Sequence, residues 1–267
     1  MTYVQELHIA VLLETRTNDL TRLSSQLRTH TICYHNDVEI GGRRGQGVAI
    51  FIHNSLAGLV QLWRVSDLYQ AVWIHINGSV FGIQGRVLLG AVYTNPCFSS
   101  RSEAEISQMF SHMQHNVSEA LSDSQHLILV GDFNAHLDNL PDHFPEGHVA
   151  MLSRFPELGI TSLGQYKDRA NTAGRCLWDI ALETPPLTTG RGKGDNGQPT
   201  FFGYNPLFNP SRTEHILMST AHFCAANKSA YYMNSTQQRR GKGKHMVWRG
   251  EHKDTFFPHM LENEIVL

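Results

Sequence analysis

Asp132 and Asn134 have the residue types and the spacing of a hydrolytic site. They follow an unbroken apolar run, residues 127–130, that is closed by Gly131. Such a run predicts a buried strand, so the two polar side chains are expected where the sheet opens to solvent. Hydrolysis of a phosphodiester needs a base for water and groups that hold the phosphate, which a carboxylate and a carboxamide can supply. The structural alternative is an Asx-type turn that caps the strand.

Glu14 stands at the end of a second short apolar run, residues 9–13. An oxygen ligand of this kind suits Mg²⁺, a hard cation that keeps much of its water and takes only one or two carboxylates. A bound cation would offset the charge that develops on a phosphate under attack. The chemistry therefore requires that these two strand ends meet at one edge of a sheet.

A helix is predicted between two of the strands that carry candidate residues. Ser102 and Glu105 have the spacing of a capping box. Apolar residues then recur at helical intervals: Ile106, Met109, Phe110, Met113, Val117 and Leu121. A helix over residues 102–122 would join a strand ending at Tyr93 to the strand ending at Asp132. The resulting β-α-β unit brings both strand exits to the same edge.

The remaining pattern predicts a mixed set of strands and one more helix. We expect a strand at residues 48–52, an antiparallel hairpin of two strands within residues 68–78 and 85–96, a helix at residues 173–184, and a strand at residues 215–218 that begins after Glu214. The glycine-rich segment before residue 48 precedes a strand, whereas a dinucleotide-binding loop follows one. Its Arg43 and Arg44 are therefore assigned to a flexible hairpin rather than to a phosphate site.

Composition limits the possible partners and compartments. The 267 residues suffice for one large or two small domains, and the net charge of -2 excludes a strongly basic nucleic-acid-binding body, so any DNA contact must be local. The basic cluster at residues 239–245 is either a solvated loop, a DNA-backbone contact or a nuclear address. The four cysteines form no C-x-x-C pair, and the first 16 residues lack a signal-peptide or membrane-span pattern. We expect an intracellular chain, nuclear or cytoplasmic, that is neither secreted nor bound to a membrane.

Four segments occur in an order that resembles the endonuclease/exonuclease/phosphatase superfamily. They are "LLETR" at residues 12–16, "AVYTNP" at 91–96, "LILVGDFN" at 127–134 and "SRTEHILMS" at 211–219. The resemblance extends over roughly residues 5–220. Within the superfamily, "GRRGQGVAIFI", "QPTFFG" and "SRTEHILMS" look most like the endonuclease domain of non-LTR retrotransposons, which nicks target DNA.

The resemblance implies an α/β fold, a four-layer sandwich of two packed mixed β-sheets flanked by helices. It also implies Mg²⁺ as cofactor, with Mn²⁺ as a substitute, and DNA as partner. By position, Glu14 resembles the Mg²⁺ ligand, Asp132 the residue that activates water, and Asn134 the group that orients water and phosphate. Tyr93 resembles the tyrosine whose hydroxyl reaches the scissile phosphate, or else it is a half-buried aromatic at a strand end. In such elements a reverse transcriptase region would belong to the same polyprotein.

The chain departs from the family pattern at three places. The family's first strand, which ends in an asparagine ligand, lies before the start of the match, and Glu214 stands where the family has an aspartate that orients a histidine. No Ser-Asp-His segment occurs after residue 219. Either a segment between Phe223 and Trp248 has been lost, or "RGEH" is a degenerate motif with His252 as the catalytic histidine. Both missing strands lie inside the family's sheets, so the fold would be incomplete, with interior sheet edges exposed.

These departures leave three functions open. The first is a Mg²⁺-dependent DNA endonuclease derived from a retrotransposon. The second is an inactive remnant with at most weak nucleic-acid binding, and the third is a phosphatase of the same superfamily. The expected organisation is a nuclease-like domain at residues 1–222, followed by an irregular basic loop and tail at residues 223–267, with a terminal helix broken near Pro258.

Overall fold

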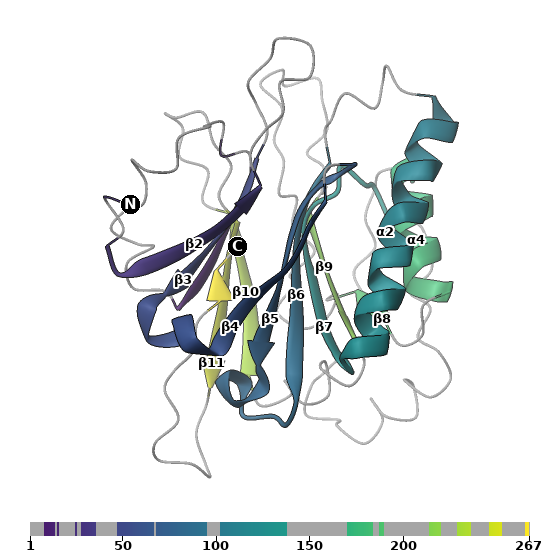
Figure 1. Ribbon diagram of the computed structural model, residues 1–267. Coiled ribbons are helices and arrows are strands. Elements are labelled where there is room, and N and C mark those ends of the chain that lie inside the picture. The colour runs from purple at the N-terminus through teal and green to yellow at the C-terminus, as the bar shows by residue number, and fades with distance from the viewer. Residues whose placement is uncertain are drawn as a thin grey trace.

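A computed structural model shows two β-sheets packed face to face, with two helices on the outer face of the larger sheet (Figure 1). The structure describes residues 8–13, 15, 25, 28–35, 47–66, 68–94, 102–137, 170–183, 187–189, 214–219, 229–235, 246–252 and 265–266. The expected α/β fold with two packed sheets and helices is confirmed. The described α-helices that cover a sheet lie on one side of the sandwich.

The smaller sheet has the strand order β12-β1-β3-β2. Its strands are β1 (Ile9–Leu13), β2 (His30–His35), β3 (Val48–His53) and β12 (Ile265–Val266). β3 runs antiparallel to both β1 and β2, whereas β12 runs parallel to β1. The predicted strands at residues 9–13 and 48–52 are therefore confirmed, and they are neighbours.

The larger sheet has the strand order β4-β5-β6-β7-β9-β8. Its strands are β4 (Val60–Ser66), β5 (Gln70–Asn77), β6 (Arg86–Tyr93), β7 (His126–Asp132), β9 (Glu214–Ser219) and β8 (Leu187–Thr189). β5 and β6 form the predicted antiparallel hairpin, and β6 and β7 are parallel. The helix α2 (Glu103–Asp123) joins β6 to β7, which confirms the predicted β-α-β unit.

The helices predicted at residues 102–122 and 173–184 both form, and each begins at a polar cap. The Ser102 hydroxyl accepts a hydrogen bond from the Glu105 amide while the Glu105 carboxylate accepts one from the Ser102 amide, so the capping box is present. α4 (Thr172–Glu183) follows Asn171, whose side chain accepts a hydrogen bond from the Gly174 amide. Capping of this kind satisfies amide groups that have no partner within the helix.

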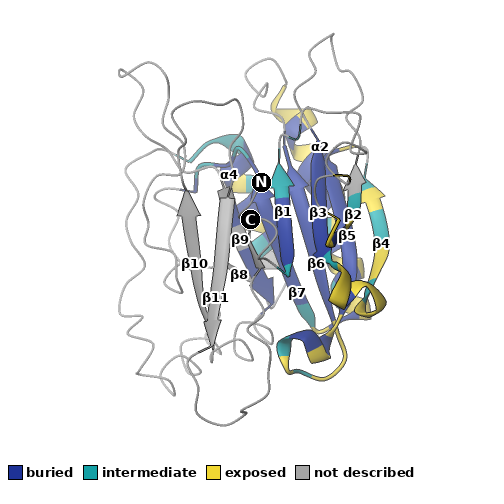
Figure 2. Cartoon of the chain, turned by 90° about the vertical axis from the view of Figure 1, so that its left-hand side faces the viewer, coloured by how far each residue is buried: buried dark blue, intermediate teal, exposed yellow. Residues whose placement is uncertain are grey.

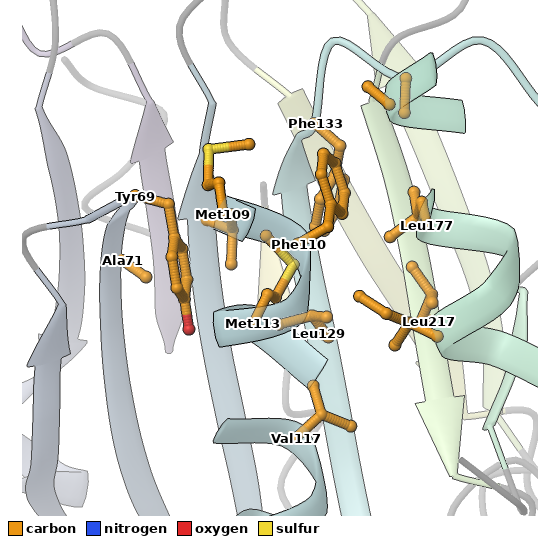
Figure 3. Close-up of a cluster of buried hydrophobic side chains, with 14 of the residues drawn as sticks. Tyr69, Ala71, Met109, Phe110, Met113, Val117, Leu129, Phe133, Leu177 and Leu217 are labelled. Carbon is orange, nitrogen blue, oxygen red and sulfur yellow. The ribbon is translucent and has the colours of Figure 1, made fainter. Parts of the chain in front are cut away.

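Alternating residues of the central strands feed two separate cores. One core lies between the sheets and includes Val72, Ile74, Leu89 and Val130. The other lies between the larger sheet and the helices, and Figure 3 shows Phe110 and Met113 of α2 beside Leu129 and Phe133. Buried residues accordingly fill β5, β6 and β7, whereas the outer strand β4 is largely exposed or half-buried (Figure 2). A strand buried on both faces explains the unbroken apolar run that precedes Asp132.

The C-terminal segment contains strands that the sequence did not predict. β10 (Ser229–Ser235) and β11 (Met246–His252) pair antiparallel in a two-stranded sheet, and β12 adds to the first sheet. The segment expected to be irregular therefore contains regular strands, held by cross-strand pairing that a local pattern does not reveal. The basic cluster at residues 239–245 and the helix expected near Pro258 lie outside the described residues. No helix in the described part of the chain is long and apolar enough to span a membrane.

Candidate active site

The candidate residues of the larger sheet lie in one row at the ends of four neighbouring strands. Gln70 of β5 pairs with Tyr93 of β6, Tyr93 pairs with Asp132 of β7, and Asp132 pairs with Glu214 of β9. Neighbouring strands are about 4.8 Å apart, so this row brings polar residues from distant parts of the sequence to one edge. We call it the strand-end row.

The smaller sheet reaches the same edge through β1 and β3. The amide of Gly47, which directly precedes β3, donates a hydrogen bond of 2.6 Å to Oε1 of Gln70 in the strand-end row. The amide of Thr15 in turn donates to the carbonyl of Gly47 at 3.2 Å. The backbone that follows β1 is therefore tied to the row. Glu14 itself lies outside the described residues, and its role as a Mg²⁺ ligand stays a prediction.

Asp132 is a buried carboxylate whose orientation is fixed by the chain that follows it. Only 2% of the residue is exposed. Its Oδ1 accepts a hydrogen bond of 3.1 Å from the Asn134 amide, and its carbonyl accepts one of 2.9 Å from the amide of Thr94. The Asx turn is thus present. A turn of this kind also holds a carboxylate in one orientation, so its presence is compatible with catalysis.

Asn134 adopts an unusual backbone conformation and is held by its side chain. Its φ of 45° lies in the left-handed region, where few residues other than glycine occur. Its Nδ2 donates a hydrogen bond to the carbonyl of Thr94, which follows Tyr93 directly. This contact links the ends of β6 and β7. In the described part of the chain Oδ1 of Asn134 forms no hydrogen bond, so the carboxamide oxygen can accept one from water or bind a cation.

Two residues that the sequence analysis did not single out brace the loop after Asp132. Asn171 donates from Nδ2 to the Asn134 carbonyl at 2.9 Å and accepts at Oδ1 from the His136 amide at 3.0 Å. Buried His215 has Nε2 at 2.7 Å from the Ala135 carbonyl, so this nitrogen carries the proton. An asparagine two residues before the predicted helix was the available signal for a cap, but nothing in the sequence indicates its contact with the loop.

The structure gives less information about the remaining predicted site residues, Tyr93, Glu214 and His252. Tyr93 is 2% exposed and packs in the core between the sheets, so it is more deeply buried than a half-exposed aromatic at a strand end. Glu214 pairs with Asp132 through the backbone, and its side chain lies outside the description. His252 ends β11 and pairs with Ser229 of β10, so it belongs to the two-stranded sheet rather than to the strand-end row.

The described side chains offer oxygen donors but no complete metal site. Among them, no group of three or more His, Cys, Asp or Glu residues could hold a metal ion. The Asp132 carboxylate and the Asn134 carboxamide oxygen are nevertheless of the type that Mg²⁺ prefers. The chemistry of these donors therefore fits Mg²⁺, with Glu14 as the further ligand that the sequence predicts.

The fold is one that nucleases and phosphatases of a single family share. The sequence pattern of the Endonuclease/Exonuclease/phosphatase family matches residues 1–232, and the chain belongs to this family. A comparison with curated proteins finds no match.

Solved structures with the same fold include enzymes of different specificity. A 3′ phosphatase, NExo, from Neisseria, bound to a product DNA hairpin, is 16% identical; the match covers 92% of this chain and 89% of that one, with a TM-score of 0.57. An AP endonuclease from Archaeoglobus fulgidus is 14% identical over 89% of this chain and 85% of that one, with a TM-score of 0.52. A mannosyl-6-phosphatase from Bacteroides thetaiotaomicron is 14% identical over 91% and 83%, with a TM-score of 0.51. These similarities establish the fold.

Proposed function

We propose that this chain is a Mg²⁺-dependent endonuclease that hydrolyses phosphodiester bonds in DNA and derives from a non-LTR retrotransposon. The observation that carries the hydrolytic part is the strand-end row, in which Asp132 lies in register between Tyr93 and Glu214. The choice of DNA and the retrotransposon origin rest on the motifs "QPTFFG" and "SRTEHILMS".

The proposed reaction is in-line attack of water on the phosphorus atom. The Asp132 carboxylate takes a proton from the water as the new P–O bond forms and the ester P–O bond breaks. Asn134 orients the water and the phosphate, and the Tyr93 hydroxyl binds the phosphate. The leaving oxygen takes a proton from solvent water, because His252, the donor that the sequence suggested, pairs with Ser229 in the two-stranded sheet and not in the strand-end row. Glu14 would hold Mg²⁺, which when bound supplies positive charge against the developing negative charge.

The first experiment is nicking of supercoiled plasmid DNA with and without Mg²⁺. Asp132→Asn is the informative variant because its carboxamide oxygen can still accept the hydrogen bond from the Asn134 amide while the base is lost. We expect a loss of activity of at least about 100-fold, the typical contribution of a general base. Asp179→Asn is the control, since Asp179 is an exposed carboxylate on α4 away from the strand-end row.

Two outcomes would contradict the proposal. Nicking that proceeds equally well without Mg²⁺ would contradict the proposed dependence on the metal. An Asp132→Asn variant as active as the wild type would show that the strand-end row does not do the chemistry. Soluble, folded protein that only retains DNA, in a manner that weakens with salt and ignores Mg²⁺, would indicate the inactive remnant.

A phosphatase is the second candidate, because a 3′ phosphatase and a mannosyl-6-phosphatase share the fold. The same preparations should be assayed for phosphate release from inositol phosphates and from a DNA strand with a 3′-phosphate. Mg²⁺-dependent release without plasmid nicking would favour this candidate over the endonuclease.

A further inference from the structure

We propose that Asn171 is a positioning residue that holds the loop carrying Asn134 in its working shape, in addition to capping α4. The loop comprises residues 132–136, and we call it the Asp132 loop. The effect on turnover rests on the proposed function, whereas the effect on the loop does not.

The Asn171 carboxamide binds the Asp132 loop in the way one peptide group binds another. Its Nδ2 donates to the Asn134 carbonyl at 2.9 Å, and its Oδ1 accepts from the His136 amide at 3.0 Å. The two bonds bracket Ala135 and fix the chain on both sides of it. A cap alone requires only the third bond, in which Oδ1 accepts from the Gly174 amide at 2.7 Å. Two of the three hydrogen bonds therefore serve the loop rather than the helix.

The two hydrogen bonds from Asn171 to the Asp132 loop support the left-handed conformation of Asn134. A left-handed φ costs most residues other than glycine roughly 1–2 kcal/mol and costs asparagine less, so the contacts around Asn134 add to its own tolerance of this conformation. Asn134 is held at its side chain by the Thr94 carbonyl and at its backbone by Asn171. Without Asn171 the contact at the Asn134 carbonyl is lost, while the bonds of Asn134 to Thr94 and Asp132 and that of His215 to the Ala135 carbonyl remain. The loop can therefore relax more easily. The Asn134 amide, which binds Oδ1 of Asp132, would move with it.

The first turn of α4 packs directly against the Asp132 loop. A Cβ atom added to Gly174 would lie 1.9 Å from the carbonyl oxygen of His136, so the first turn of α4 touches the loop backbone directly. The helix end and the loop therefore form one rigid unit, and the Asn171 side chain is its hydrogen-bonded link. Catalytic groups that shift by about 1 Å can lose about 100-fold in rate, which is the scale of the expected effect.

Three variants separate the effect of the helix cap from the effect of the two hydrogen bonds to the Asp132 loop. Asn171→Ser keeps a good capping residue but removes the donor to Asn134 without adding charge. Asn171→Asp keeps an acceptor for Gly174 and His136, but it replaces the donor by a carboxylate oxygen that repels the Asn134 carbonyl, and it adds a negative charge. Ser102→Ala is the matched control, because it removes the cap of α2 and the Ser102 side chain bonds only to Glu105, although α2 packs against Phe133 of the loop further along the helix.

Three measurements are made on each full-length variant: the thermal midpoint, hydrogen exchange of the peptide covering residues 131–137, and kcat and KM for plasmid nicking. We expect Ser102→Ala to lower the midpoint by roughly 2–4 °C with normal exchange and kcat. Both Asn171 variants should lower the thermal midpoint by no more than this control does. Hydrogen exchange in the loop should nevertheless be about 10-fold faster, and kcat should be roughly 10- to 100-fold lower at nearly unchanged KM.

Each outcome decides a separate statement. Normal loop exchange in Asn171→Ser would overturn the inference, as would accelerated exchange with unchanged kcat in an active enzyme. A wild-type protein that cuts no DNA would overturn the proposed function instead, and the exchange data would still decide whether Asn171 holds the loop.

Discussion

At the scale of single residues, Asp132 and Asn134 show that the same pair of side chains can have both a structural role and a catalytic one. The Asx turn between them uses the same carboxylate that the proposed reaction needs as a base. Their types and spacing were readable from the sequence. The left-handed backbone of Asn134 and its bond to the Thr94 carbonyl were not, because both depend on a strand 40 residues earlier in the chain.

The strain at Asn134 predicts a difference between two small substitutions. Both Asn134→Gly and Asn134→Ala remove the carboxamide, and both should abolish most of the proposed activity. Glycine tolerates a φ of 45° whereas alanine does not, so the alanine variant should be less stable by about 1 kcal/mol. Urea unfolding of the two proteins measures this difference. Equal stabilities would show that the loop relaxes once the side chain is gone.

At the scale of elements, the β-α-β unit sets the register of the site. Gly131 leaves no space for a side chain against β6, since an added Cβ would lie 1.9 Å from the carbonyl oxygen of Val92. The sequence presented this glycine as the end of an apolar run. Its function in the structure is to let the two strands approach closely enough for Tyr93 and Asp132 to pair.

Gly131→Ala should therefore separate the strands at the site. We expect a loss of about 1–3 kcal/mol or more in the free energy of unfolding, as for other overpacked positions, together with reduced activity. Gly58→Ala is the matched control, because no atom lies within 4 Å of its added Cβ. That variant should be unchanged or slightly more stable. Denaturant titrations of both variants provide the comparison, and a Gly131→Ala protein of wild-type stability would contradict the packing argument.

The elements that the sequence missed have identifiable causes. β4 was overlooked because its pairing with β5 shifts register between Leu62 and Arg64, which breaks the alternation of apolar and polar residues. Leu62 is 50% exposed, so its apolar character does not report burial. α2 was predicted almost to the residue, since its capping box and helical periodicity are local signals. Local sequence patterns thus predicted the central β-α-β unit. The outer strand β4 could not be predicted in this way, because it forms through its pairing with β5.

At the scale of the whole molecule, buried His75 and half-buried His126 make the stability of the fold depend on pH. Burial lowers the pKa of His75, with a further contribution from the nearby Arg86 and an opposing one from Asp123. Burial also lowers the pKa of His126 at the start of β7. In both cases the folded state binds a proton less readily than the unfolded chain.

Stability should therefore fall on mild acidification. The unfolded chain takes up protons at these histidines near pH 6.5, so the folded state loses stability as the pH falls from that value through the lowered pKa values. His126→Gln should reduce this dependence between pH 7 and 5. Thermal midpoints across this range test the prediction, which fails if His126→Gln follows the wild-type curve.

The pairing of β1 with β12 has a consequence for how the chain reaches its native state. Ile9 and Ala10 pair with Ile265 and Val266, so the smaller sheet is completed by residues from opposite ends of the sequence. Contacts of such long sequence separation carry a large loop-closure entropy and slow folding. The β-α-β unit, built from residues 86–132, can form much earlier. During synthesis, a ribosome-bound chain would thus assemble the part that bears Asp132 before the sheet that β1 belongs to is complete, with one edge of β1 accessible to chaperones or to strands of other molecules.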